Sequence, residues 1–289
     1  MGNGFTAKIS VDRLSLVNSW HESGFSHGFL DRSLNLRQIP LGQEIHLSTR
    51  DAELNQRGKN TKLFLLHQVH GDKVIQITKN ILQHPTSRPE GDAWFIALDD
   101  QLPDSNDNSS LGNSIALGIM TADCFPVILF DQKQQLASIA HFGWRGVVGE
   151  LLENILTLFH THGSSTKDIE VAIGPGIGCA DFETGNEVLA EFRNKLLSTQ
   201  TTAKQNWYKS SEHNENKYLI DIPSFLSLLC LRYGISEHAI YTDKRSTLTT
   251  ECLFSYRRDK EAAGRQLSFV AFDFPLFPQS ASFLGKLFY

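Results

Sequence analysis

The segment FPVILFDQKQQLASIAH, residues 125–141, consists of two apolar runs separated by five polar residues. Apolar runs of four to eight residues that end at polar residues are typical of buried strands. We therefore predict strands at residues 125–130 and 136–141, joined by a turn within residues 131–135. Paired residues of this hairpin would have numbers that sum to about 265 or 266, so His141 would lie opposite Cys124 or Phe125. Directly opposed residues have Cβ atoms about 4.5–5.5 Å apart, which is close enough for a thiol and an imidazole to share a site.

The pattern on both sides of this hairpin alternates between strands and helices. Helical periodicity predicts helices over residues 147–159, 188–196 and 223–233. Further strands are predicted at residues 62–68, 73–78, 94–98, 115–120, 169–173, 218–222, 239–242, 253–256 and 267–272. The polar segments at residues 99–114 and 198–216 are predicted to be surface excursions, because neither separates parts that look able to fold alone. We expect a single domain of mixed α and β structure, residues 1–289.

The composition of the 289 residues is that of an ordinary globular protein, with 40% hydrophobic residues, 20% charged residues and a net charge of -5. This charge argues against a nucleic-acid or anionic-membrane partner, since phosphate groups bind to basic surfaces. The N-terminal residues lack the apolar core of a signal peptide, and no apolar run is long enough to span a bilayer. The four cysteines form no Cys-x-x-Cys pair, which favours a reducing compartment. We expect a cytoplasmic protein.

Cys124 and His141 are the first candidates for chemistry. A thiolate and an imidazole at this separation can hold a zinc ion, and they can equally form a nucleophilic thiolate–imidazolium pair. They can also be a buried cysteine and a hydrogen-bonded histidine without a catalytic role. His141 precedes a glycine-rich turn, residues 142–146, and free N–H groups at the start of a helix would suit an anion. His70 ends another predicted strand, but sequence spacing does not place it beside Cys124.

Seven motifs along the chain carry a family resemblance. They are His-Gln-Val-His-Gly (67–71), Glu-Gly-Asp-Ala (90–93), Thr-Ala-Asp-Cys-Phe-Pro-Val (121–127), His-Phe-Gly-Trp-Arg-Gly (141–146), Ile-Gly-Pro-Gly-Ile-Gly (173–178), Phe-Ser-Tyr-Arg-Arg-Asp (254–259) and Gly-Arg (264–265). In this order they resemble the YfiH-type laccase-domain family, first called multicopper polyphenol oxidases and later assigned as purine nucleoside phosphorylases. The resemblance covers roughly residues 25–272 and leaves an aromatic tail, residues 273–289, outside it.

The resemblance implies a fold, a metal and an activity. The expected fold is α+β, a single domain in which mixed β-sheets are flanked by helices in an α/β/β/α arrangement. One zinc ion, with copper as the alternative, would be held by His70, Cys124 and His141. The activity would be phosphorolysis of adenosine, inosine, guanosine and methylthioadenosine, with adenosine deamination as a second activity. Purine nucleosides and phosphate would be the partners of a monomer or a small homo-oligomer.

Further residues are expected to bind or position the substrate. Asp123 is predicted to orient a ligand histidine or to act as a general base. The family's glycine segment is missing after Arg32, and Phe142 stands where the family usually has alanine. We nevertheless expect the Arg32 segment to line the pocket as a lid. Because guanidinium groups match phosphate oxygens, the candidates for phosphate binding are Arg32, Arg145, Arg257 and Arg258.

Three other functions stay open at this point. A copper-dependent polyphenol oxidoreductase would use the same ligands, although a multicopper oxidase needs many more histidines in paired motifs. A metal-free cysteine hydrolase would use a Cys124–His141 dyad on an acyl substrate. A scaffold without activity would keep the site only to hold zinc. The bound metal and the products formed from adenosine and phosphate distinguish these functions.

Overall fold

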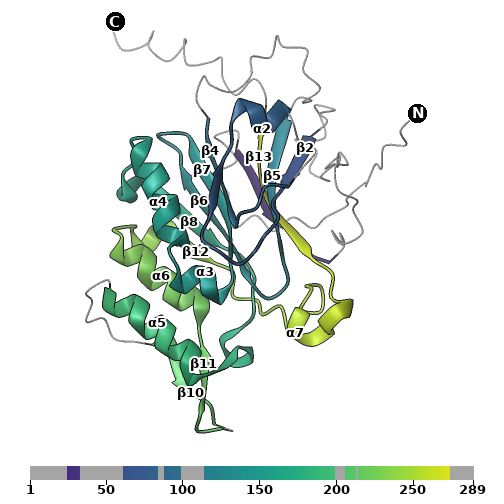
Figure 1. The fold of residues 1–289 in the computed structure, drawn as a ribbon, viewed down its shortest axis with the longest axis vertical. Helices are drawn as coiled ribbons and strands as arrows, with labels where there is room; N and C mark the ends of the chain where they lie inside the picture. Colours follow the sequence, from purple (N-terminus) through teal and green to yellow (C-terminus); the bar gives the residue numbers. More distant parts are fainter. Residues whose placement is uncertain are drawn as a thin grey trace, which may run out of the picture.

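The computed structural model describes residues 25–32, 61–83, 88–98, 114–198, 206–212 and 214–273. A six-stranded sheet built on the predicted hairpin lies at its centre (Figure 1). In spatial order its strands are β12 (Ile240–Thr242), β8 (Ile169–Ile173), β6 (Phe125–Asp131), β7 (Leu136–Phe142), β4 (Ala93–Ala97) and β3 (Val74–Gln76). Both hairpin strands, β6 and β7, are buried along their whole length, as their apolar runs predict.

The register of the β6–β7 hairpin differs from the predicted one. His141 pairs with Pro126, so paired numbers sum to 267. The turn has four residues because the Asp131 side chain accepts hydrogen bonds from the backbone N–H groups two and three residues later, at 2.8 and 3.0 Å. Cys124 consequently lies just before β6 begins and is not directly opposite His141.

A four-stranded sheet packs against one face of the six-stranded sheet. In spatial order its strands are β1 (Phe25–Phe29), β13 (Gln266–Asp273), β5 (Ser114–Thr121) and β2 (Thr61–Leu65). Its pairs are antiparallel except for the parallel pair of β2 and β5. Aromatic and branched side chains from both sheets, among them Phe25, Trp94 and Phe130, are fully buried between them. Burial of this apolar surface holds the two sheets together.

Helices cover the other face of the six-stranded sheet (Figure 1). They are α3 (Trp144–Val148), α4 (Leu151–Thr161), α5 (Asn186–Ser198) and α6 (Ile222–Arg232). The single helix predicted over residues 147–159 is two helices, because the chain turns at Gly149. The Gly149 N–H bonds to the Arg145 carbonyl at 2.8 Å, and a Cβ there would lie 2.9 Å from that oxygen. This position therefore requires glycine.

The layers agree with the expected α+β class, with one difference. Helices, the six-stranded sheet and the four-stranded sheet form three successive layers. On the outer face of the four-stranded sheet, the group of buried described residues comes only from strands and from Leu30, which follows β1. Among the described residues, no helix contributes to that group. The fourth layer of the predicted α/β/β/α arrangement is thus not seen in the described part of the chain.

Shorter elements complete the structure. A small sheet contains β10 (Tyr208–Ser210), β11 (Lys217–Ile220) and β9 (Glu183–Gly185), and two short helices are α2 (Lys79–Gln83) and α7 (Tyr256–Asp259). The 3-10 helices are η3 (Thr166–Asp168), η4 (Cys179–Asp181), η5 (Glu237–Ala239) and η6 (Lys260–Ala262).

The strand predicted at residues 253–256 is wrong. The Ser255 hydroxyl accepts a hydrogen bond from the Arg258 N–H at 3.1 Å and begins α7 instead. Residues 274–289, which form most of the predicted aromatic tail, lie outside the described residues. Within the described ranges, no helix has the length and apolar character needed to cross a membrane.

Candidate functional site

Three potential metal ligands from separate parts of the chain meet at one end of the six-stranded sheet. His70 follows β2, Cys124 lies between β5 and β6, and His141 is near the end of β7. Their ligand atoms, two imidazole nitrogens and one thiol sulfur, all lie within 4.8 Å of one another. Neighbouring ligand atoms of a tetrahedral zinc site are about 3.5 Å apart. The three side chains therefore need only a small adjustment to hold one metal ion.

Asp92 supports two of these ligands, a role that its place in the sequence does not predict. Its side chain is fully buried, and Oδ1 accepts a hydrogen bond from His141 Nδ1 at 2.8 Å. The same carboxylate accepts hydrogen bonds from the backbone N–H groups of Val69 at 3.2 Å, His70 at 3.0 Å and Gly71 at 2.8 Å. His141 is thereby left with Nε2 available to a metal ion. The loop that carries His70 is folded around the carboxylate.

Charges in this cluster stabilise one another. Burial alone would raise the pKa of the Cys124 thiol, but hydrogen bonds with His141 and His70 outweigh burial and lower it to about 6. Burial would likewise lower the pKa of His141, but hydrogen bonds with Asp92 and Cys124 raise it to about 9. Burial would raise the pKa of Asp92, but hydrogen bonds from His141 and Gly71 outweigh burial and lower it. These shifts favour a thiolate–imidazolium pair at neutral pH.

The ligands open into a cavity of about 1220 Å³, which is large enough for a small-molecule substrate. The described acidic residues that line it are Asp123 and Glu261. Cationic side chains outnumber them: Arg88, Arg257, Lys260 and Arg265. Aromatic residues on the lining are Phe142, Trp144, Phe182 and Tyr256. The cavity thus offers an anion-binding part and an aromatic part beside the potential metal ligands.

Of the four arginines predicted to bind phosphate, the structure places Arg257 on this cavity. Arg88, Lys260 and Arg265 also line it and were not among the predicted residues. Arg145 is exposed, and its guanidinium lies over the Trp144 ring at 4.5 Å. It is not among the described residues that line the cavity.

Arg32 is not among the residues that line the cavity, and the rest of the expected lid, from residue 33 on, lies outside the described residues. The Arg32 backbone N–H bonds to the Cys252 carbonyl at 2.8 Å, and its Nη1 donates to the Glu251 carbonyl at 2.9 Å. The guanidinium lies 5.2 Å from the centre of the Phe254 ring. The short chain after β1 is therefore held against the loop that precedes α7.

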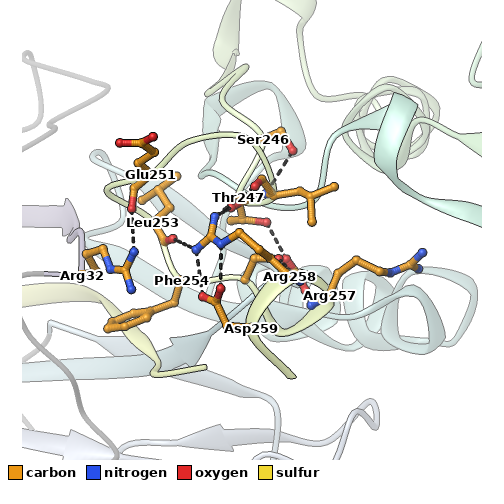
Figure 2. A network of polar contacts seen from close by, with 12 residues as sticks. Arg32, Ser246, Thr247, Glu251, Leu253, Phe254, Arg257, Arg258 and Asp259 are labelled. Carbon is orange, nitrogen blue, oxygen red and sulfur yellow. Dashed lines mark hydrogen bonds and ion pairs between the residues drawn. The ribbon is translucent and has the colours of Figure 1, made fainter. Parts of the chain in front are cut away.

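Arg258 lies in the centre of a polar network (Figure 2). Nη1 donates to the carbonyls of Thr247 and Leu248, each at 3.0 Å, and Nη2 donates to the Leu253 carbonyl at 2.7 Å. Nε and Nη2 also bind the Asp259 carboxylate at 2.8 and 2.9 Å. A guanidinium has five N–H donors, and the protein uses all of them. Arg258 is thus a structural residue and not a phosphate ligand in this conformation.

Asp92, and not Asp123, orients the ligand histidine His141. The Asp123 carboxylate instead accepts hydrogen bonds from the Thr247 hydroxyl at 2.7 Å and from the Arg257 N–H at 2.6 Å. Asp123 lines the cavity with a φ of 87°. A positive φ is costly for any residue other than glycine, so these two bonds stabilise a strained turn next to Cys124.

Backbone strain is concentrated at this cavity. Four described residues other than glycine have a positive φ, and three of them line the cavity: His70 at 63°, Asp123 at 87° and Lys260 at 49°. Strained backbone is retained mainly where function requires it. This distribution supports a functional site.

The chain contains one His-x-His pair, His160 and His162, and it lies away from the three ligands at the end of α4. The Nδ1 atoms of these histidines lie near the carbonyls of Ser164 at 3.1 Å and Leu158 at 2.8 Å. Within the described residues, the group with metal-binding geometry is His70, Cys124 and His141. The pair therefore does not add a copper centre to the described structure.

Sequence comparison places the chain in a known family. The family described as multi-copper polyphenol oxidoreductase laccase matches residues 17–273. The chain belongs to this family. Its laccase-family relatives include YfiH of Escherichia coli, which is 30% identical over 206 residues, 71% of this chain and 72% of the relative. YlmD of Geobacillus stearothermophilus is 29% identical over 205 residues, 70% of this chain and 69% of the relative. Both relatives are named purine nucleoside phosphorylase.

Two solved structures share the fold of this chain. The crystal structure of the hypothetical protein YfiH from Bacillus licheniformis superposes with a TM-score of 0.66 at 20% identity, over 89% of this chain and 95% of that one. YlmD from Geobacillus stearothermophilus superposes with a TM-score of 0.65 at 23% identity, over 86% of this chain and 92% of that one. These similarities confirm the α+β fold predicted from the sequence.

Proposed function

We propose that this laccase-family chain is a zinc-dependent purine nucleoside phosphorylase. Its substrates would be adenosine, inosine, guanosine and methylthioadenosine, and adenosine deamination would be a second activity. The observation that carries the proposal is the cavity, in which three potential zinc ligands, several cationic side chains and several aromatic side chains face one space. The names of the Escherichia coli and Geobacillus relatives support the same reaction.

The ligand set suits zinc. Thiolate and imidazole are common zinc ligands, and a buried carboxylate behind a ligand histidine, as in Asp92 behind His141, is a usual support. When bound by three protein ligands, zinc keeps an open position and acts as a Lewis acid. His70, Cys124 and His141 would hold it. Copper can occupy the same ligands, so metal analysis must accompany the activity assay.

Phosphate would bind at the cationic side chains of the cavity. Arg257 belongs to α7, Lys260 begins η6, and Arg265 directly precedes β13, so all three come from one short segment. Arginine and lysine are the usual partners of phosphate oxygens. Arg265 lies 5.8 Å over the Tyr256 ring, which keeps its guanidinium beside this segment. Phosphate would thus share a cavity with the nucleoside, as phosphorolysis requires.

The purine would contact the aromatic part of the cavity. Trp144 begins α3 directly after the turn that follows β7, and Phe182 and Tyr256 line the same space. Aromatic rings stack on purines without distinguishing their exocyclic groups. Such contacts would accept adenosine, inosine and guanosine alike.

The test is to supply adenosine, with and without phosphate, to zinc-loaded protein and to separate the products by chromatography. Phosphorolysis predicts adenine release that depends on phosphate, and deamination predicts slower inosine formation that does not. Cys124→Ala should abolish both, because it removes a metal ligand. Inosine without any adenine at saturating phosphate would contradict the phosphorylase and leave a deaminase.

A second candidate is a copper-dependent polyphenol oxidoreductase, which the family's description favours. A multicopper oxidase needs several copper centres, whereas the described residues contain one group with metal-binding geometry. Copper-loaded protein should therefore oxidise phenols slowly or not at all. Rapid oxygen consumption with a phenol, and no adenine from adenosine, would favour this candidate over the phosphorylase.

A further inference from the structure

The turn that contains Cys124 is held by hydrogen bonds to residues that are distant in the sequence. The side chain of the adjacent Asp123 accepts a hydrogen bond from the Thr247 hydroxyl on Oδ1 and one from the Arg257 N–H on Oδ2. The Asp123 backbone carbonyl accepts a third hydrogen bond, from the Ile177 N–H at 2.9 Å. Cys124 itself lies outside the strands, one residue before β6. Its position therefore depends on how firmly Asp123 is held.

Thr247 is the fully buried residue among these hydrogen-bond partners. It has no exposed surface, and its backbone N–H donates to the Gly176 carbonyl at 2.8 Å while its hydroxyl donates to Asp123 at 2.7 Å. One residue thus joins the glycine-rich turn after β8 to the turn before β6. Neither bond can be replaced by water, because the residue is fully buried.

Arg258 holds Thr247 from the other side. Nη1 of Arg258 donates to the Thr247 carbonyl, and the same guanidinium binds the Leu253 carbonyl and the Asp259 carboxylate (Figure 2). The guanidinium therefore ties residues 247–253 to the start of α7. The Arg257 N–H that binds Asp123 also comes from α7.

From these contacts we propose that Thr247 is a positioning residue for the candidate metal site, acting on Cys124 through Asp123, and that Arg258 acts through Thr247. A metal site requires its ligands to be held within about 0.5 Å of the productive geometry by their surroundings. The Thr247–Asp123 bond supplies that restraint for Cys124, which lies outside the strands. This inference rests on the proposed metal-dependent function.

The test is zinc affinity, measured by competition with a chromophoric chelator. Thr247→Val keeps the shape of the side chain and removes only the hydroxyl, and we expect zinc to bind about 10-fold more weakly. Thr247→Ser keeps the hydroxyl and should bind zinc like the wild type. Thr184→Val is the matched control, since Thr184 is also buried but donates to a carbonyl of the small sheet at 3.4 Å. It should leave zinc affinity unchanged.

A double-mutant cycle tests the order of action. Arg258→Lys should weaken zinc binding, and combining it with Thr247→Val should add little, because both changes remove one restraint. If the fold-loss of zinc affinity in the double variant equals the product of the two single-variant losses, the two residues act independently. That result would overturn the role assigned to Arg258. Should Arg258→Lys fail to fold, the threonine variants still decide the role of Thr247.

Two further outcomes separate this inference from the proposed function. Wild-type protein that binds no zinc would overturn the proposed function. The rate of alkylation of Cys124 in metal-free protein, measured by peptide mass spectrometry, would then still test whether Thr247 holds the turn in place. Cys124 should react faster in Thr247→Val than in the wild type. Thr247→Val that matches the wild type in both zinc affinity and alkylation rate would overturn the positioning role.

Discussion

Asp92 and His141 are joined by a hydrogen bond of 2.8 Å between Oδ1 and Nδ1, and both side chains are buried. Because the same carboxylate also binds the N–H groups on either side of His70, one residue fixes two potential metal ligands from distant parts of the chain. This arrangement fixes the imidazole orientation of His141 before a metal binds.

Asp92→Ala is expected to destabilise the protein by about 3–5 kcal/mol, since it leaves a buried imidazolium and three N–H groups without their acceptor. Urea unfolding of metal-free protein measures this loss. Asp168→Ala is the control, because Asp168 pairs with the exposed Lys133, and an exposed ion pair contributes little to stability. Equal effects of the two substitutions would show that Asp92 has no special role.

Much of the central sheet follows from local sequence pattern. The apolar runs of β6 and β7 predict two buried strands, and the glycine-rich turn after His141 predicts the start of a helix. The register does not follow from that pattern, because it depends on Asp131, whose side chain fixes a four-residue turn. A single short polar residue thus shifts the pairing.

The supporting residues of the site could not be predicted in the same way. Asp92 belongs to the Glu-Gly-Asp-Ala motif, directly before an apolar strand, and this placement is the sequence feature that indicates a buried carboxylate. Its contact with His141 arises because β4 pairs with β7, which spacing does not reveal. Residue type and the family resemblance make Arg32 and Arg258 candidates for phosphate binding, whereas their contacts with backbone carbonyls depend on the folded loop.

Zinc affinity is expected to increase with pH. The pKa of His141 is raised to about 9, so below that pH a proton must leave Nε2 before a metal binds. The pKa of Cys124 is lowered to about 6, so the thiol is already ionised at neutral pH. Between pH 7 and 9 the affinity should therefore increase about 10-fold per pH unit, as expected for release of one proton. Chelator competition at several pH values measures it, and a constant affinity over this range would show that His141 is neutral in the metal-free protein.

Arg257→Ala is expected to raise the KM for phosphate by about 10- to 100-fold, with a smaller change in the KM for adenosine. The range corresponds to loss of a charged hydrogen bond of about 1.5–3 kcal/mol. Arg145→Ala should have a smaller effect on phosphate, because Arg145 stacks on Trp144 and does not line the described cavity. Steady-state kinetics with phosphate as the varied substrate compare the two variants. A larger effect of Arg145→Ala would place the phosphate at the turn before α3 instead.

The central claim is that the metal site and the cationic part of the cavity act together on a nucleoside and phosphate. Phosphorus NMR of zinc-loaded protein with adenosine and inorganic phosphate tests it most directly. We predict a ribose 1-phosphate signal that grows in step with adenine, disappears when the metal is removed and returns when zinc is restored. No sugar phosphate from zinc-loaded protein, or equal amounts from zinc-loaded and metal-free protein, would contradict the proposed function.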